Sequence, residues 1–475
     1  MPPGATEVPV AIVGAGACGL VAALALREAG IECLLLERDA VPGGSTGLSS
    51  GFIPAAGTPV QRRAGVLDDS PERFAADIQA KAHGTAAPHL VQAYTRAIGP
   101  ALALIERHGL VFELLEGFLY PGHSLPRMHT LAERTGAALV GALARAAEAA
   151  GALLLPRARV VELWCDEAGR VIGVGAERPG GAIEHVACRA LLLACNGFGG
   201  NAALVGELLP EMRDAVFAGH VGNDGSALLW ARALGLALAD LGGYQGHGSW
   251  AVPQGALITW AIMSAPRAGP ARPAPRGGSS SPAEPDQLES AGGLQVNAEG
   301  RRFHDETAGY SEAAVHVLAQ PGGTAWNVFD DRLLALARGF PDFVAAEAAG
   351  ARRSAADAAA LAALIGCDPS TLAQTLAGTR LVPPYHAIRV TGALFHTQGG
   401  LDVDGDCRAR FADGRAHPNL FAAGGAARGV SGNAVWGYLS GNGLLSAVAG
   451  GFIAARSIAA LLEGRGPTPP AGAAA

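Results

Sequence analysis

Three glycines near the N-terminus have the spacing of a nucleotide-binding turn. Gly14, Gly16 and Gly19 follow an apolar run and open an alanine- and leucine-rich segment, and Glu37 lies about 20 residues further on. Such glycines permit a tight turn, bring backbone N–H groups up to a pyrophosphate and let helix and strand pack closely. The Glu37 carboxylate can accept from a ribose 2′-hydroxyl and disfavours a 2′-phosphate. The pattern predicts a dinucleotide site at the start of the chain.

The residues that follow favour FAD over NAD as this dinucleotide. Small residues fill positions 43–46 and 49–51, where a long extended cofactor has to pass close to backbone. The chain has one complete fingerprint of this kind, so a separate NAD(P)H domain is not expected. Electrons would then be exchanged with an unknown donor or acceptor, such as a quinone, a second substrate or oxygen.

The elements that would position this turn alternate between strand and helix. We expect strands at 8–13 and 31–37, joined by a helix that ends near Ala29. Further strands are predicted within 153–164 and at 170–175, 190–195 and 419–425, with surface helices between 70 and 150 and a small-residue helix at 441–461. This alternation predicts an α/β fold with a Rossmann-type FAD-binding domain.

The bulk composition argues against several classes of protein. Of the 475 residues, 49% are hydrophobic and 16% charged, the formal net charge is -7, and Lys and Arg form no block. Binding to nucleic acid or to an anionic membrane surface is therefore not expected, and a small molecule is the expected substrate. Seven cysteines without a CxxC spacing predict neither disulfides nor a metal site, and they are compatible with the cytoplasm. We expect no signal peptide and no membrane-spanning segment.

Further motifs occur at intervals along nearly the whole chain. They are LLACNGFG at 192–199, NAEGRRFHDE at 297–306, HTQGGL at 396–401, LFAAG at 420–424 and GNGLL at 441–445. Together with the N-terminal fingerprint, they resemble the flavoprotein family that contains soluble fumarate reductases, succinate dehydrogenase flavoprotein subunits and 3-ketosteroid Δ1-dehydrogenases. The resemblance implies an enzyme that transfers a hydride between FAD and a carbon of an activated C–C bond.

The resemblance also implies a domain division and a set of FAD contacts. An α+β cap domain at 243–395, which would bind the substrate, is inserted between the two parts of the FAD-binding domain, 1–242 and 396–475. Residues 266–290, rich in Pro, Gly, Ser and Arg, are expected to be a disordered insertion within the cap. The expected FAD contacts are Gly14, Ala15, Gly16, Gly19, Glu37, Arg38, Gly44, Ser45, Thr46, Ser50, Gly51, Val160, Asn196, Gly197, Gly424, Asn442, Leu444 and Leu445.

The chain departs from this family at positions that matter for chemistry. Ser45 stands where members with covalent flavin have a histidine, so FAD is expected to bind non-covalently. Gly425 replaces an acidic residue that contacts the flavin. The arginine that serves the fumarate reductases as proton donor is replaced by Tyr310, and an arginine that holds the substrate carboxylate is replaced by Tyr438.

Other positions keep the residues of the fumarate reductases. His247 and His396 match the two histidines that contact the substrate carboxylates there, and Thr259 matches as well. The glutamate and second arginine of their proton relay are replaced by Trp260 and Met263. The ketosteroid dehydrogenases, in contrast, carry tyrosines at both of the replaced arginine positions. The resemblance therefore implies a hybrid pocket.

These matches imply roles for the side chains. Tyr310 would be the base in dehydrogenation or the acid in reduction, and as a base its pKa, ordinarily about 10, would have to be lowered by a neighbour or by shared charge. Tyr438, with backbone N–H groups of nearby glycines, would donate to an enolate oxygen. The remaining expected contacts of the substrate are His247, His396, Thr259 and, as a pocket wall, Trp260. Tyr120 is expected to be a turn residue, and Arg389 and Arg428 are expected at the surface.

Three hypotheses for function remain at this point. The first is a dehydrogenase or reductase that acts at the α,β position of a ketone or monoacid, with tyrosines as the acid–base groups. The alternative is a fumarate reductase-like enzyme that reduces an unsaturated dicarboxylate, which His247, Thr259 and His396 allow. The third is a flavin-binding protein without activity, suggested by the lost arginines.

Overall fold

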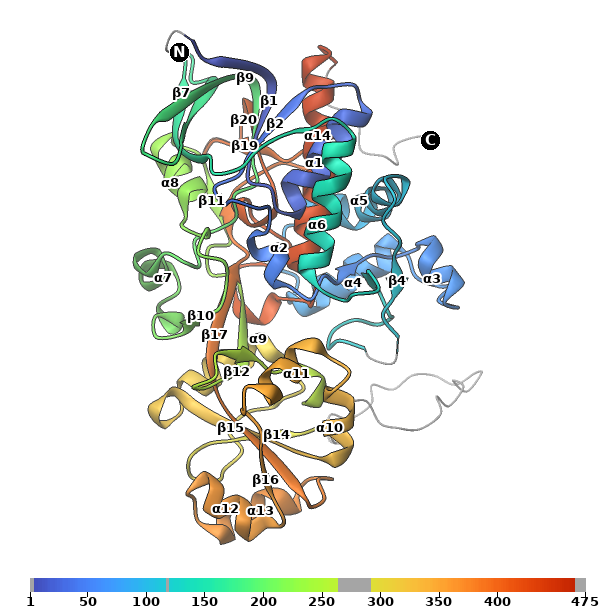
Figure 1. Cartoon of the computed structure of the whole chain (residues 1–475), viewed down its shortest axis with the longest axis vertical. Helices are drawn as coiled ribbons and strands as arrows, with labels where there is room; N and C mark the ends of the chain where they lie inside the picture. The colour runs from blue at the N-terminus through green and yellow to red at the C-terminus, as the bar shows by residue number, and fades with distance from the viewer. Residues whose placement is uncertain (1–3, 117–118, 264–291, 466–475) are drawn as a thin grey trace.

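Two lobes, each built around its own sheet, make up the computed structural model of the chain (Figure 1). The structure describes residues 4–116, 119–263 and 292–465. The expected insertion at 266–290 lies outside the described residues. The predicted α/β architecture with a parallel sheet is confirmed.

The larger lobe is organised by an eight-stranded sheet. Its parallel strands run in the order β20 (Ala416–Ala422), β9 (Ile183–Leu193), β1 (Thr6–Val13), β2 (Cys33–Leu36) and β6 (Leu153–Leu155). Three antiparallel strands complete it, β19 (Arg408–Arg410) beside β20, and β8 (Val171–Glu177) and β7 (Arg159–Cys165) beyond β9. Residues 10–13 and all of β2 are buried, as expected for parallel strands covered on both faces.

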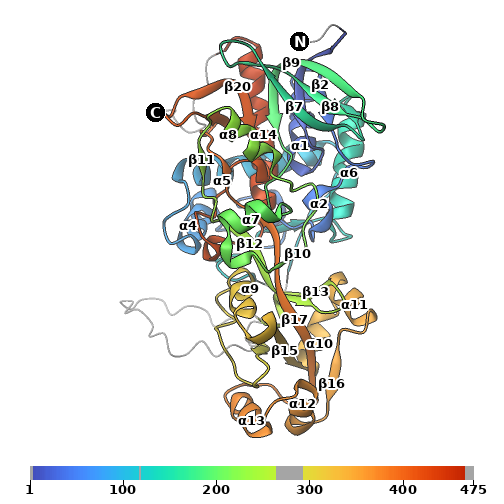
Figure 2. The same ribbon diagram turned by 90° about the vertical axis from the view of Figure 1, so that its left-hand side faces the viewer.

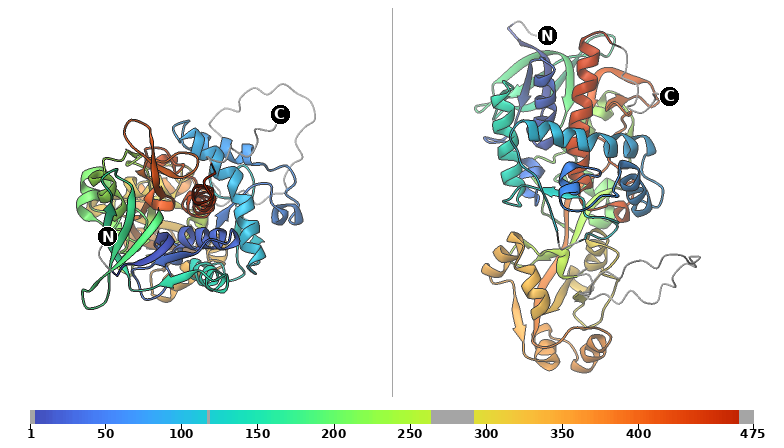
Figure 3. Two further views of the ribbon diagram at one scale, coloured as in Figure 1. Left: turned by 90° about the horizontal axis from the view of Figure 1, so that it is seen from above. Right: turned by 90° about the vertical axis from the view of Figure 1, so that its right-hand side faces the viewer.

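Helices α1 (Ala17–Glu28), α6 (Gly136–Ala149) and α14 (Asn442–Leu462) pack beside this sheet, and α5 (Pro88–Arg107) crosses α14 (Figure 3). The expectation that no segment could span a membrane is wrong in one respect, because α14 is long and apolar enough to do so. However, 72% of its most apolar window is buried. The contacts of α14 with α1 and α5 account for its apolar surface.

The rest of the larger lobe consists of short elements. The helices are α2 (Gly44–Leu48), α3 (Pro59–Arg63), α4 (Pro71–Lys81), α7 (Ala202–Leu208) and α8 (Ser226–Ala233). One small sheet joins β3 (Ile53–Pro54), β5 (Met128–Thr130) and β4 (Glu113–Leu114), and another pairs β11 (Leu238–Ala239) with β18 (Gly400–Leu401).

The smaller lobe is built on a seven-stranded sheet whose central strand is β17 (Tyr385–Thr397). The order is β13 (Ala256–Leu257), β12 (Tyr244–Ala251), β17, β15 (Thr324–Asp330) and β14 (Leu294–Val296), with β10 (Val216–Phe217) and β16 (Arg353–Ala355) also paired to β17. Its helices are α9 (Tyr310–Leu318), α10 (Asp331–Ala337), α11 (Pro341–Ala348), α12 (Ala358–Ile365) and α13 (Pro369–Ala377). Figure 2 shows β17 running from the smaller lobe up to the larger one, which brings its last residues to the boundary between the lobes.

Candidate active site

The glycine turn has the close backbone packing that its sequence predicts. Gly14 has a φ of +103°, and a Cβ at this position would lie 2.6 Å from the Ala194 carbonyl oxygen. A Cβ on Gly19 would lie 2.0 Å from the Gly14 oxygen, so α1 can approach β1 only if this residue is glycine. The turn leads directly into α1, whose N-cap, Gly16, offers no side-chain cap. The first N–H groups of α1 are therefore suited to bind an anion.

Two side chains fix the backbone around this turn. The buried Glu37 carboxylate accepts from the Ala15 N–H at 2.8 Å and from the Asp39 N–H at 2.9 Å. The Thr46 hydroxyl accepts from the Ala17 N–H at 3.0 Å. Because each carboxylate oxygen has two lone pairs, Glu37 can still accept a hydrogen bond from a ribose.

A first cavity of about 790 Å³ extends from the glycine turn over the ends of β1, β2 and β9. Its lining includes Gly14, Gly16, Glu37 and Asn196, and also Asn223, whose buried Oδ1 has no partner among the described residues. A glycine-walled cleft beside a helix N-terminus and an unsatisfied acceptor fits an FAD, whose ribose and adenine offer donors. Ser45, Thr46, Asn196 and Ala447 also line a second cavity, so the two spaces share a wall.

The expected FAD contacts divide into two groups. Those that line one of the two cavities are Gly14, Gly16, Glu37, Arg38, Gly44, Ser45, Thr46, Ser50, Val160, Asn196 and Leu444. Those that do not are Ala15, Gly19, Gly51, Gly197, Gly424, Asn442 and Leu445. Asn442, for example, is fully buried and donates to the Ser431 hydroxyl at 3.0 Å. Sequence reasoning missed Arg159, His220, Asn223 and Trp230, which line the first cavity.

The second cavity, of about 1270 Å³, lies between the lobes. It brings together every side chain that was predicted to act on the substrate. These are Tyr310, Tyr438, His247, His396, Thr259 and Trp260. They come from α9, the turn before α14, the paired strands β12 and β17, and the segment after β13.

The aromatic rings of this cavity contact one another closely. His247 stacks on Tyr310 with ring centroids 4.9 Å apart, and the rings of Tyr310 and Tyr438 meet edge-on at 6.2 Å. His396 meets Tyr438 at 5.7 Å. A register shift in the pairing of β12 with β17 follows His247, and such an irregularity re-aims side chains. The Tyr438 oxygen lies near Gly443, and the backbone of Gly441 and Gly443 together with the Tyr310 side chain acts to lower the Tyr438 pKa.

Burial keeps these groups uncharged at neutral pH. It lowers the pKa of His247 to about 3 and that of His396 to about 4, so both imidazoles are neutral. It raises the pKa of Tyr438 to about 12, against the hydrogen bonds from Gly443 and Gly441. It also raises the pKa of Tyr310 well above its usual value, and a hydrogen bond with Ser440 only partly offsets this. A tyrosine that acts as a base needs a lowered pKa, and the expectation of such a pKa for Tyr310 is therefore wrong. Tyr310 is a proton donor at neutral pH.

Asp342 is the one Asp, Glu, Lys or Arg side chain among the described residues that line the second cavity. It lies in the first turn of α11, and burial raises the pKa of its carboxyl although the Ser50 hydroxyl donates to it. With neutral imidazoles and this carboxyl, these walls offer no cation to a substrate carboxylate.

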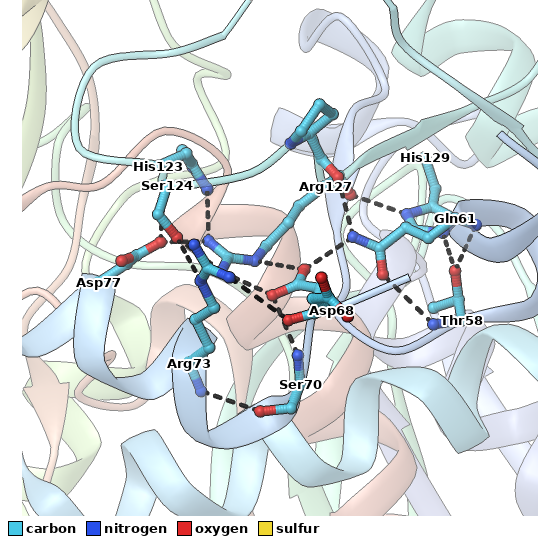
Figure 4. Close-up of polar contacts among 12 residues, drawn as sticks. Thr58, Gln61, Asp68, Ser70, Arg73, Asp77, His123, Ser124, Arg127 and His129 are labelled. Carbon is cyan, nitrogen blue, oxygen red and sulfur yellow. Dashed lines mark hydrogen bonds and ion pairs between the residues drawn. The ribbon is translucent and has the colours of Figure 1, made fainter. Parts of the chain in front are cut away.

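A buried ion-pair network supports one wall of the cavity. Figure 4 shows Arg127 reaching between Asp77 and the residues around Gln61. Arg127 is fully buried and donates to both oxygens of Asp69 at 2.8 Å, and it also pairs with Asp77. His123 contacts Arg127 through Nδ1 and bonds the Ser440 carbonyl oxygen through Nε2 at 2.9 Å. The network thereby ties the segment around Tyr120, which lines the cavity, to the turn that carries Tyr438.

Three other expectations have mixed outcomes. Tyr120, for which a turn role was expected ahead of a role in assisting the reaction, lines the second cavity. Arg389 is exposed on β17 and donates to the Thr324 hydroxyl at 3.4 Å, in agreement with a surface role. The surface role expected for Arg428 is wrong, because its side chain is only 17% exposed and pairs with Asp240 at 2.8 Å and with Asp402 at 2.9 Å. Two carboxylates that are distant in sequence neutralise it, which its local sequence does not indicate.

Comparisons with known proteins agree with this geometry. The sequence model of the family described as "FAD binding domain" matches residues 9–444. A fumarate reductase (cytochrome) from Shewanella frigidimarina is 27% identical over 447 residues, which cover 90% of this chain and 73% of that protein. A flavocytochrome c3 fumarate reductase in its open conformation has a similar structure, with a TM-score of 0.78, 23% identity and coverage of 96% of this chain and 79% of that one.

A second solved structure is similar over nearly the whole of both chains. It is a 3-ketosteroid-Δ4-(5α)-dehydrogenase from Rhodococcus jostii RHA1, with a TM-score of 0.72, 23% identity and coverage of 96% of this chain and 97% of that one. Identities this low show a shared fold only. The family match spans most of the sequence and includes the glycine turn and both tyrosines. The chain therefore belongs to the FAD binding domain family and is an FAD-dependent oxidoreductase.

Proposed function

We propose that the enzyme transfers a hydride between FAD and a carbon α,β to the carbonyl of an uncharged ketone or enone. The observation that carries this proposal is the second cavity, where two buried phenols meet and the described walls contain no cation. When bound, FAD accepts or supplies the hydride. The chain itself has to bind the carbonyl compound, exclude water and handle one proton and one developing enolate charge.

In this proposal Tyr310 is the acid or base and Tyr438 the donor to the enolate oxygen. The backbone of Gly441 and Gly443 acts to lower the Tyr438 pKa, but burial outweighs this effect, so the hydroxyl stays protonated at neutral pH and can donate to the enolate oxygen. Neutral His247 and His396 hold their rings against the tyrosines and supply hydrogen bonds without charge. Because Tyr310 is protonated at neutral pH, the resting chain is prepared for reduction of a C=C bond, and the same groups serve dehydrogenation at higher pH.

The proposal extends to features that the comparisons leave open. FAD is bound non-covalently, which is supported by Ser45, whose oxygen accepts from the amides of Asn196 at 2.6 Å and Asn223 at 3.1 Å. The cap corresponds to residues 243–395 and the FAD-binding domain to 1–242 and 396–475. The enzyme works in the cytoplasm with an electron partner that remains to be identified.

A reductase of an unsaturated dicarboxylate is the second candidate. It is favoured by the 27% identity to a fumarate reductase and by His247, His396 and Thr259 in the cavity wall. Cations would bind the two carboxylates of its substrate best, and among the described lining residues there is no Lys or Arg side chain, while Asp342 contributes a carboxyl group.

An anaerobic flavin titration tests both candidates and also the inactive alternative. Purified protein saturated with FAD is mixed with a panel of cyclic ketones. After chemical reduction, it is mixed with the corresponding enones or with fumarate. We expect ketones to bleach the flavin absorbance, enones to restore it and fumarate to leave it unchanged. Rapid reoxidation by fumarate together with no response to any ketone or enone would overturn the proposal.

Tyr310→Phe is the matched variant for the same assay. It should keep its FAD content and visible spectrum while turnover of the responding substrate falls on the order of 100- to 10,000-fold, the usual contribution of a general acid–base group. Turnover at the wild-type rate would remove Tyr310 from the mechanism.

A further inference from the structure

The ion pair between Lys81 and Glu312 crosses from the larger to the smaller lobe next to Tyr310. Lys81 is the last residue of α4, and Glu312 is the third residue of α9, the helix that begins with Tyr310. Both side chains are largely buried, with 14% and 12% exposure, and the Lys81 ammonium bonds the Glu312 carboxylate directly. It also donates to the Ala308 carbonyl oxygen at 2.8 Å. One cation thus binds the chain on both sides of Tyr310.

The start of α9 is also held by the Ser311 hydroxyl, which accepts from the Gly246 N–H at 2.8 Å, and by packing of the helix against β12. Its N-cap is Gly309, with a φ of +137° and no side-chain cap. A Cβ on Gly309 would lie 2.7 Å from Glu312 Oε2, so the carboxylate packs over this glycine. That same oxygen is buried and makes no hydrogen bond with the described residues. A buried carboxylate oxygen without a hydrogen-bond partner costs free energy. A purely structural role for the ion pair does not explain why this oxygen is left unpaired.

Among the described residues, the ionisable groups that act on Tyr310 include Tyr438, Tyr120 and Glu312, and the neutral His247 stacks on its ring. Those around Glu312 are Lys81, His83 and Tyr244. Burial raises the pKa of Glu312, and the charge and hydrogen bond of Lys81 oppose this. The carboxylate is therefore the anion whose field reaches the Tyr310 phenol, and Lys81 is the cation that balances it.

We propose that Lys81 and Glu312 are positioning residues that hold Tyr310 at the lobe boundary and together set the electrostatic environment of its hydroxyl. The part that concerns catalysis rests on the proposed function. Without Lys81, the Glu312 charge acts unopposed on Tyr310 and disfavours the phenolate. Without Glu312, the lysine charge favours it. The two single substitutions should consequently change proton transfer in opposite directions, whereas a pair that only fastens the lobes would give two changes of the same sign.

The experiment compares FAD-saturated wild type with Lys81→Met, Glu312→Gln, the double variant and Lys81→Arg. Glu72→Gln is the matched control, because it removes an exposed ion pair between the same helix, α4, and Arg96 without reaching the smaller lobe. The first measurement is hydrogen–deuterium exchange of the backbone amides of residues 305–313, which requires no substrate. We expect faster exchange in Lys81→Met and Glu312→Gln, protection close to wild type in Lys81→Arg, and no change in Glu72→Gln.

The second measurement is the pH profile of turnover with the ketone or enone found in the flavin titration. The alkaline transition assigned to Tyr310 should move to higher pH in Lys81→Met and to lower pH in Glu312→Gln. The double variant should lie between them, with kcat reduced on the order of 10- to 100-fold by the misplaced hydroxyl. Unchanged exchange at 305–313 in Lys81→Met, or pH shifts of the same sign in both single variants, overturns the inference. If no substrate responds in the titration, the proposed function fails while the exchange measurement still decides whether the pair holds this segment.

Discussion

Tyr438 is the residue whose geometry most directly indicates a task in transition-state stabilisation. Its side chain lines the second cavity beside the rings of Tyr310 and His396, and burial raises its pKa to about 12, so the hydroxyl holds a proton to donate. We expect Tyr438→Phe to lower kcat on the order of 100- to 1,000-fold, as loss of one oxyanion donor typically does, while FAD content stays unchanged. Steady-state kinetics with the responding substrate measures this. Tyr385→Phe, a buried tyrosine of β17 outside both cavities, serves as the control.

The contrary outcome for Tyr438 is a rise in KM with an unchanged kcat. In that case the hydroxyl would bind the carbonyl equally well in the ground state and in the transition state, and it would have no part in stabilising the enolate.

For single residues, the sequence predicts which residue types form the site better than it predicts where each side chain points. Tyr310, Tyr438, His247 and His396 were predicted, because motif spacing identifies positions that face a cofactor, whereas Tyr120 was expected to be a turn residue. Asn442 and Leu445 belong to an equally good motif, yet their side chains turn into the core, since helix α14 presents only part of its first turn to the cavity. Asp342 was missed because it belongs to no motif and reaches the site through the placement of α11.

At the scale of helices and strands, the close contact of α1 with the end of β1 depends on Gly19, which has no side chain. We expect Gly19→Ala to destabilise the protein by about 1–3 kcal/mol or more, the usual result of overpacking, because its Cβ would overlap the Gly14 carbonyl oxygen. FAD affinity should fall with it, since the same turn leads into the N-terminus of α1. Thermal unfolding and FAD content after dialysis measure both effects.

Gly141→Ala provides the matched comparison on a neighbouring helix. Gly141 lies within α6, and its added Cβ would meet only the flexible end of Arg145, at 3.4 Å. It should stabilise the helix by about 0.5–1 kcal/mol and leave FAD binding unaffected. Equal behaviour of the two variants would mean that the close approach of α1 to β1 is not required.

Sequence patterns predicted best the helices and strands that are surrounded by the protein core along most of their length. The strand β1, whose second half is buried, the fully buried β2 and the helix α14 were placed within two residues of their observed ends. β9 begins at Ile183, well before the predicted start at residue 190. Its first half pairs with the antiparallel strand β8 and is partly exposed, so it lacks the continuous apolar pattern of a buried strand. β17 was not predicted, since its partners β12, β15 and β16 come from distant parts of the chain and their contacts decide its conformation.

For the whole molecule, the two lobes place a cavity whose described lining has one ionisable carboxyl group and no Lys or Arg next to a cleft that suits a dinucleotide. The larger lobe has a continuous core of its own around the parallel sheet, and a second core fills the smaller lobe and includes Tyr310 and Tyr438. Both phenols thus belong to the packing of the smaller lobe, while the cleft belongs to the larger one. This division allows the acid–base groups and the cofactor site to be changed separately.

The stability of the whole molecule should depend strongly on mild acid. Burial lowers the pKa of His247 to about 3, and it is the largest cause that lowers the pKa of His123, His129, His304 and His396 to about 4. The unfolded chain takes up protons on these side chains near pH 6.5, whereas the folded chain does not until much lower pH. Their contribution to stability is therefore complete above about pH 6.5 and is lost as pH falls from there toward about 4.

Each of these histidines can remove up to about 1.4 kcal/mol per pH unit within this window. The raised pKa values of Glu306 and Glu312 act in the opposite sense, over the pH range between the ordinary pKa of a glutamate and the raised one. Urea unfolding at pH 7.5, 6.5, 5.5 and 4.5 measures this effect. Saturating FAD is present at each pH so that loss of the cofactor does not change the result. The free energy of unfolding should fall below pH 6.5. His304→Gln should reduce the pH dependence of the free energy of unfolding by the contribution of one histidine. The substitution should be tolerated, because the partner of His304, Gln295, remains bonded to the Asn327 side chain and to the Gly248 carbonyl oxygen. A free energy that stays constant from pH 7.5 to 5.5 would mean that the histidines reach water in the folded protein, which the closely packed rings of the second cavity do not allow.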